Sequence, residues 1–285
     1  KPLNFVQARH EPGEKRFLGH TIAAGTPGRT ALKQALDVIA AHPNVGPFIG
    51  RQLIQRLVTS NPSPAYVKRV ARVFADNGRG LRGDLGAVVG AVLLDPEAQR
   101  APDPRADGAG LLREPMVRFV QWGRTFGANP NGTSAKPWGI GNATSNAFRL
   151  AQSPLRSPSV FNFFRPGYIP PNTAMAARRL TAPEFQLTNE TSVAAWVNFA
   201  QQFVSAGVAD VKPRYDAELA LAPDAAALVA RLDLLLTAGT LSAPSRELIT
   251  QAVASIDART ATGPRNRVWA AVHLVMCSPD YLVAA

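Results

Sequence analysis

The sequence predicts a mainly α-helical fold: an array of short antiparallel helices, with a small β-hairpin at the N-terminus and one long loop. Apolar residues recur at spacings of three and four through most of the chain, as on the buried face of a helix. Proline, Asn-Gly and Asp-Pro interrupt these segments at short intervals, which is typical of short helices joined by short connections. Residues 128–172 lack this periodicity and are rich in Gly, Pro, Asn and Ser, which predicts an aromatic loop rich in Gly and Pro.

The first third of the chain contains the predicted hairpin and a predicted array of four helices. Two β-prone runs, 3–7 and 16–22, flank Glu11-Pro12-Gly13 and predict the hairpin. Ser63 and Asp84 are suitable N-caps for the third and fourth helices, because their side-chain oxygens can accept from free backbone N–H groups. The apolar spacing and the stop signals predict helices over 31–41, 45–57, 64–76 and 85–94.

The remaining helices are expected on both sides of the long loop. Met116, Phe119 and Trp122 recur at helical spacing and predict a buried face within 111–126. The loop at 128–172 contains several aromatic residues, and so long a loop is usually functional or packed by its own side chains. Further helices are predicted at 191–205, 224–237, 245–256 and 264–277. We expect one helical domain over 1–285, with a helical hairpin array at 28–98, the loop, and C-terminal helices at 190–283.

Composition limits the class of protein. Of 285 residues, 46% are hydrophobic and 18% charged, which is too apolar for a disordered chain. Cys277 is the only cysteine, so an internal disulfide and a Cys-rich zinc module are both excluded. The longest apolar stretches, 86–94 and 269–277, are much shorter than the roughly 20 residues that cross a bilayer. The sequence therefore predicts no membrane span.

Basic charge is the main indication of a partner. The chain carries 31 Lys and Arg against 20 Asp and Glu, a formal charge of +11, and the excess lies in the first two thirds. Such a balance is compatible with an anionic polymer or a protein partner, but a merely solvated basic surface is the interpretation that the sequence favours. Nucleic-acid binders usually interleave aromatic residues with the charge. Tyr66 is the only aromatic residue between Arg51 and Arg72, where basic residues are frequent, so DNA or RNA is not favoured. The candidate anion-binding residues are Arg51, Arg56, Lys68, Arg69, Arg72, Arg79 and Arg82.

Two motifs suggest chemistry that their context does not support. Residues 78–83 match the dinucleotide fingerprint G-x-G-x-x-G, but a helix precedes them instead of the strand that the fingerprint requires. His10-Glu11 begins like a zinc-protease helix, but Pro12 and Gly13 cannot continue that helix. A looser metal site at His10, Glu11 and His20 stays open if the hairpin brings these side chains together. The sequence predicts no cofactor and leaves the catalytic residues unknown.

Three stretches carry a family resemblance: HPNVGPFIGRQLIQRLVTSNPSPAYVKRVARVFADNGRGLRGDLGAVVGAVLLDPEA at 42–98, SPSVFNFFRPGYIPP through APEFQLTNE at 157–190, and RVWAAVHLVMCSPDYL at 267–282. With them the chain resembles the bacterial family catalogued as domain of unknown function 1800. The resemblance implies an exported, helical protein, periplasmic or extracellular, of which this chain is the C-terminal part. It implies no catalytic residues, because none are established for the family.

These observations leave two classes of function. The first is a non-catalytic binding or structural module that uses its basic surface to hold an anionic polymer, or a protein partner that includes the N-terminal part. The second is a hydrolase acting on an extracellular polymer, with chemistry near His10, Glu11 and His20 or in that N-terminal part. The sequence therefore leaves open whether the protein is an enzyme.

Overall fold

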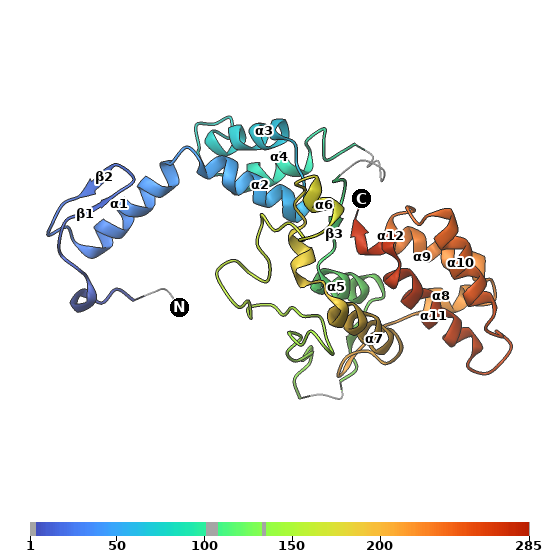
Figure 1. The fold of residues 1–285 in the computed structure, drawn as a ribbon. Coiled ribbons are helices and arrows are strands. Elements are labelled where there is room, and N and C mark those ends of the chain that lie inside the picture. The colour runs from blue at the N-terminus through green and yellow to red at the C-terminus, as the bar shows by residue number, and fades with distance from the viewer. Residues whose placement is uncertain (1–3, 101–107, 133–134, 285) are drawn as a thin grey trace. The chain divides into compact units, whose positions relative to one another are not determined.

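The structure is a computed structural model, and it describes residues 4–100, 108–132 and 135–284. The chain forms two compact units, residues 1–101 and 102–285, which we describe one at a time. In the described residues the secondary structure is mainly helical, and the strands form three short antiparallel pairs (Figure 1). The mainly α fold that the sequence predicts is thus confirmed. That the whole chain, residues 1–285, forms a single helical domain stays a prediction.

The N-terminal hairpin exists, but it is smaller than predicted. Strands β1 (Lys15–Phe17) and β2 (His20–Ile22) pair antiparallel, with Phe17 opposite His20. Leu18 and Gly19 form the turn with φ values of 49° and 75°, as a two-residue turn of type I′ requires. Both strands therefore come from the second predicted run, 16–22, and the residue just before it. The first predicted arm is wrong in its described part, 4–7, which is not a strand and leads into the 3₁₀ turn η1 (Gln7–Arg9).

Four helices complete unit 1, close to the predicted bounds. They are α1 (Gly28–Ala41), α2 (Val45–Leu57), α3 (Pro64–Ala75) and α4 (Leu85–Leu93). Helices α2, α3 and α4 lie side by side (Figure 1) and enclose a core formed by Ile54, Tyr66, Val70, Phe74, Val88 and Val92. The predicted apolar face of α1 exists, but Leu32, Leu36 and Ile39 on it are about half exposed.

The glycine motif at 78–83 connects α3 to α4. Gly78, Gly80 and Gly83 have φ values of 86°, 73° and 78°, in the left-handed region that residues with a Cβ rarely adopt. Asp76 and Asn77 accept hydrogen bonds from backbone N–H groups of this turn, including those of Gly78 and Arg79 at 2.8 and 2.9 Å. The glycines therefore serve a compact helix-to-helix turn.

Unit 2 contains the remaining helices and two strand pairs. The helices are α5 (Pro115–Thr125), α6 (Ala174–Ala177), η2 (Pro183–Leu187), α7 (Glu190–Ala206), α8 (Asp216–Leu221), α9 (Ala225–Leu232), the π-helical turn η3 (Asp233–Thr237), α10 (Ala243–Ala254), α11 (Gly263–Cys277) and α12 (Pro279–Leu282). Strand β3 (Leu111–Leu112) pairs with β6 (Val283–Ala284), and β4 (Asn129–Pro130) pairs with β5 (Val211–Lys212).

Aromatic residues of α5 and α7 form the centre of the core of unit 2. The Trp122 and Phe203 rings lie 4.7 Å apart between centroids, and Phe119 contacts both. Helix α11 packs against α7 and adds Val272 and Met276, both fully buried. This core places the start of α5, the start of α7 and the end of α12 around one cavity, described below.

The long loop has the expected character. The described residues between β4 and α6 contain no helix or strand. Leu150 and Phe164 are buried, whereas Phe148, Leu155 and Val160 are largely exposed. The buried side chains of Leu150 and Phe164 thus hold part of the loop against the rest of unit 2. Within the described ranges, no helix is long and apolar enough to cross a bilayer.

Candidate functional site

The predicted anion-binding residues fall into two groups in unit 1. Lys68 and Arg72 lie one helical turn apart on α3, opposite the buried side chains of Tyr66 and Val70, and both are exposed. Arg51 on α2 and Arg79 in the turn after α3 are exposed as well. In the described part of unit 1 these four side chains make no hydrogen bond or ion pair, so their charges are available to a partner.

The other predicted cations already have contacts within the protein. The Arg69 guanidinium donates to both Asp95 oxygens at 2.7 Å. Arg82 donates to the Ala40 carbonyl at 2.9 Å and to the His42 carbonyl at 3.1 Å, and so caps the C-terminus of α1. Arg56 lies half-buried in the last turn of α2. Arg69 and Arg82 are exposed too, so the two groups differ in their internal contacts and not in exposure.

The candidate metal ligands do not form a cluster. His10 Nε2 lies 3.3 Å from the Thr26 carbonyl. Glu11 pairs with Lys15 at 3.3 Å and accepts from the Gly13 backbone N–H, which holds the pKa of this carboxyl below its usual range. His20 is exposed on β2. Among the described residues, no group of three or more His, Cys, Asp or Glu side chains could hold a metal ion.

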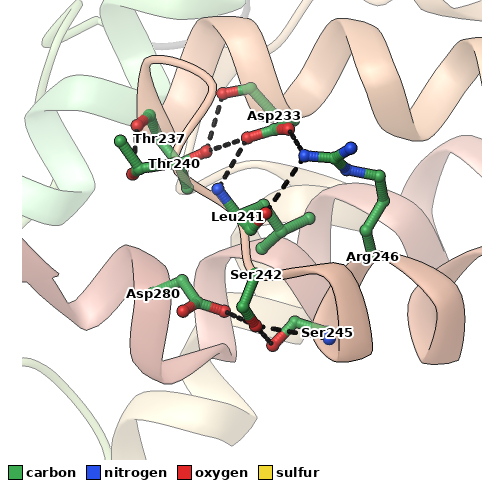
Figure 2. A network of polar contacts seen from close by, with 8 residues as sticks. All are labelled: Asp233, Thr237, Thr240, Leu241, Ser242, Ser245, Arg246 and Asp280. Carbon is green, nitrogen blue, oxygen red and sulfur yellow. Dashed lines mark hydrogen bonds and ion pairs between the residues drawn. The ribbon is translucent and has the colours of Figure 1, made fainter. Parts of the chain in front are cut away.

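A polar network in unit 2 joins η3 to α10 and α12 (Figure 2). Asp233 is buried, and its carboxylate accepts from the Thr237 hydroxyl, the Leu241 N–H and Arg246 Nη2. Ser242 caps α10 and donates to Asp280 Oδ2 at 3.1 Å. Each of these groups has a protein partner, so the network holds the helices together.

Arg118, which sequence reasoning missed, makes fewer side-chain hydrogen bonds than Arg267, the other buried cation among the described residues. Its side chain is 6% exposed, its Nε donates to the Arg113 carbonyl at 2.7 Å, and its guanidinium lies 4.9 Å from the centroid of the Trp196 ring. In the described part of unit 2 neither Nη group has a hydrogen-bond partner, and no carboxylate pairs with it. Burial lowers the pKa of Arg118 to about 10, so it stays charged at neutral pH.

The Arg118 side chain lines a small cavity within unit 2. The cavity has a volume of about 70 Å³ and is lined by the end of β3, the start of α5, the end of η2, the start of α7, the end of α12, and residues 149–150. Arg149 is its second cation, half-buried and 5.0 Å from the centroid of the Phe199 ring. A signal existed in the sequence, because Arg118 lies four residues before Trp122 and so shares the buried face of α5.

The described residues define a mainly helical protein, in which Lys68 and Arg72 are exposed on α3. Residues 1–283 match the family described as protein of unknown function (DUF1800), and the chain belongs to that family. Neither a curated protein nor a solved structure matches the chain.

Proposed function

We propose that the protein is a non-catalytic binding module that holds an anionic polymer through the exposed cations of unit 1. The observation that carries this proposal is the pair Lys68 and Arg72, exposed on one face of α3 without an internal partner. Arg51 and Arg79 are the further candidate contacts. The proposal includes a periplasmic or extracellular location, which rests on the family resemblance and is tested by fractionating cells that produce the whole protein.

The charges of α3 support a partner outside the chain. Two like charges one turn apart on a helix repel each other by a few tenths of a kcal/mol, and an anion between them removes that cost. Other cations of unit 1 have an acidic neighbour: Lys33 pairs with Asp37 at 2.6 Å and Arg16 with Glu14 at 2.5 Å. Lys68 and Arg72 therefore differ from these cations in pairing as well as in position.

The test is salt-dependent retention on immobilised dextran sulfate and on polyglutamate. We expect the double variant Lys68→Gln, Arg72→Gln to elute at lower salt than the wild type. Its affinity should also depend less steeply on salt, because fewer counterions are released on binding. The matched control is the double variant Arg16→Gln, Lys33→Gln, which removes the same net charge from unit 1. It should elute close to the wild type.

Two results would contradict the proposal. Retention that does not depend on salt would exclude an electrostatic surface. Equal losses in the two double variants would show that net charge alone governs retention, and that α3 holds no particular site.

A further inference from the structure

We propose that the cavity beside Arg118 binds the carboxylate of a small molecule or chain end that carries an apolar group. The site lies wholly within unit 2 and is separate from the basic surface of unit 1, so this inference goes beyond the proposed function. It rests on an incompletely bonded buried guanidinium, a cavity beside it, and the chemistry of the residues that line the cavity.

The contrast with Arg267 shows what Arg118 lacks. Both side chains are buried, with exposed fractions of 6% and 9%. Arg267 donates to four backbone carbonyls, of Ile256, Ala222, Pro223 and Ala254, at 2.7 to 3.1 Å. Arg118 donates only through Nε, to Arg113. An internal charge with unused donors costs free energy unless something pairs with it, which makes an anion the complementary ligand.

The cavity gives such an anion a place. Its volume of about 70 Å³ is several times the roughly 10–15 Å³ that a cavity needs to hold one water molecule, and suits a carboxylate with a short apolar group. Arg149 adds a second positive charge, and its guanidinium has no hydrogen-bond partner in the described part of unit 2. Thr188, just before α7, lines the cavity and has a hydroxyl, and the positive end of the 17-residue helix favours an anion there.

The lining distinguishes a carboxylate from a phosphate. Leu112, Leu150, Leu187 and Leu282 form much of the wall. A phosphate dianion would turn several of its oxygens toward these side chains, where they would lose hydration without gaining a donor. A carboxylate has two oxygens, which match the fork of one guanidinium, and its apolar group can cover the leucines. The geometry therefore selects a carboxylate with an apolar neighbour.

The experiment measures binding to the whole chain by titration calorimetry at low salt with four named probes. Butyrate represents a free short-chain acid, and N-acetyl-leucine represents a peptide C-terminus. N-acetyl-leucine amide has the same shape without the charge, and inorganic phosphate tests the competing anion. We expect saturable binding of one or both acids, no binding of the amide, and at least tenfold weaker binding of phosphate. The stronger of the two acids identifies the source of the carboxylate.

Variants connect the binding to the cavity. Arg118→Gln should weaken binding of the acid at least tenfold, the loss expected when a charge-assisted pair is removed. Arg149→Gln should weaken it less, because Arg149 is only half-buried. Val193→Trp fills the mouth of the cavity without changing charge, so it tests the site even if Arg118→Gln fails to fold. Arg124→Gln is the matched control, an exposed arginine of α5 outside this cavity.

The outcomes separate this inference from the proposed function. The double variant Lys68→Gln, Arg72→Gln should bind the acid as the wild type does, since both residues lie in unit 1. No saturable binding of either acid, or binding that survives both Arg118→Gln and Val193→Trp, would overturn the inference. Phosphate that binds as tightly as the acids would overturn the assignment of the ligand class.

Discussion

Arg69 and Asp95 form a two-point ion pair, in which Nε donates to Oδ2 and Nη2 to Oδ1, each at 2.7 Å. The pair connects α3 to the turn that follows α4. Asp95 is 6% exposed, and its hydrogen bonds with Arg69 hold the pKa of this carboxyl below its usual range. Arg69, a candidate contact for an external anion in the sequence analysis, thus already pairs with a carboxylate of the protein itself.

Replacing Asp95 with Asn should destabilise the protein. The change removes one partner of a buried, charge-assisted pair, and we expect the free energy of unfolding to fall by about 1–3 kcal/mol. The measurement is urea denaturation of the whole chain, followed by circular dichroism. Asp37→Asn is the control, because Asp37 is exposed in its pair with Lys33, and it should change stability by only a few tenths of a kcal/mol. Equal losses in the two variants would contradict a special role for the buried pair.

The same pair gives a pH dependence of known sign. The pKa of Asp95 is lower in the folded chain than in the unfolded chain, where it is about 3.9. Its contribution is therefore complete above about pH 4 and is lost as the pH falls through the folded pKa. The stability difference between wild type and Asp95→Asn should shrink below about pH 4. A difference that stays constant down to pH 2 would contradict this origin.

Tyr215→Phe should destabilise unit 2 by removing one buried hydroxyl. That hydroxyl accepts from Trp122 Nε1 at 3.0 Å and donates to the Val204 carbonyl at 3.1 Å. Its loss leaves both groups unpaired in the core, so we expect about 2 kcal/mol lower stability in denaturation experiments. Tyr168→Phe is the control, since the Tyr168 hydroxyl makes no hydrogen bond among the described residues. A loss no larger than in the control would show that the buried hydroxyl contributes little.

Two glycines with similar positive φ angles should respond differently to alanine. Gly207 has a φ of 75°, and a Cβ there would lie 2.2 Å from the Val211 carbonyl oxygen. Gly239 has a φ of 81° with nothing within 4 Å of the Cβ position. Gly239→Ala should cost about 1 kcal/mol, from the left-handed backbone alone. Gly207→Ala adds a backbone clash and should lower the melting temperature clearly more, which thermal unfolding of the two variants measures. Equal shifts would contradict the close approach.

Local signals predicted much of the helical structure. The predicted caps are correct: Ser63 Oγ accepts from the Tyr66 N–H and Asp84 Oδ1 from the Ala87 N–H, each at 3.1 Å. Helices 45–57 and 264–277 begin and end within one residue of their predicted bounds. These boundaries depend on residues close in sequence, which is why the sequence could predict them.

Long-range contacts explain the errors. The helix predicted from residue 111 begins at Pro115, because Leu111 and Leu112 pair with β6 at the far end of the chain. The hairpin turn uses Leu18-Gly19, which lacks the Asn-Gly or Asp-Gly signal of such turns. The cavity is formed by residues of β3, α5, α7 and α12, which are far apart in the sequence. No local sequence pattern indicates that these elements lie next to one another.

The two buried arginines should respond in opposite ways to replacement by methionine. Arg118→Met removes a buried charge that has one hydrogen bond, so the ligand-free chain should be as stable as the wild type or up to about 3 kcal/mol more stable. Arg267→Met leaves four buried carbonyls without their donor and should cost about 3 kcal/mol or more. Urea denaturation without ligand compares the two. A large loss of stability in Arg118→Met would show that the guanidinium supports the fold, and would leave the cavity without its spare charge.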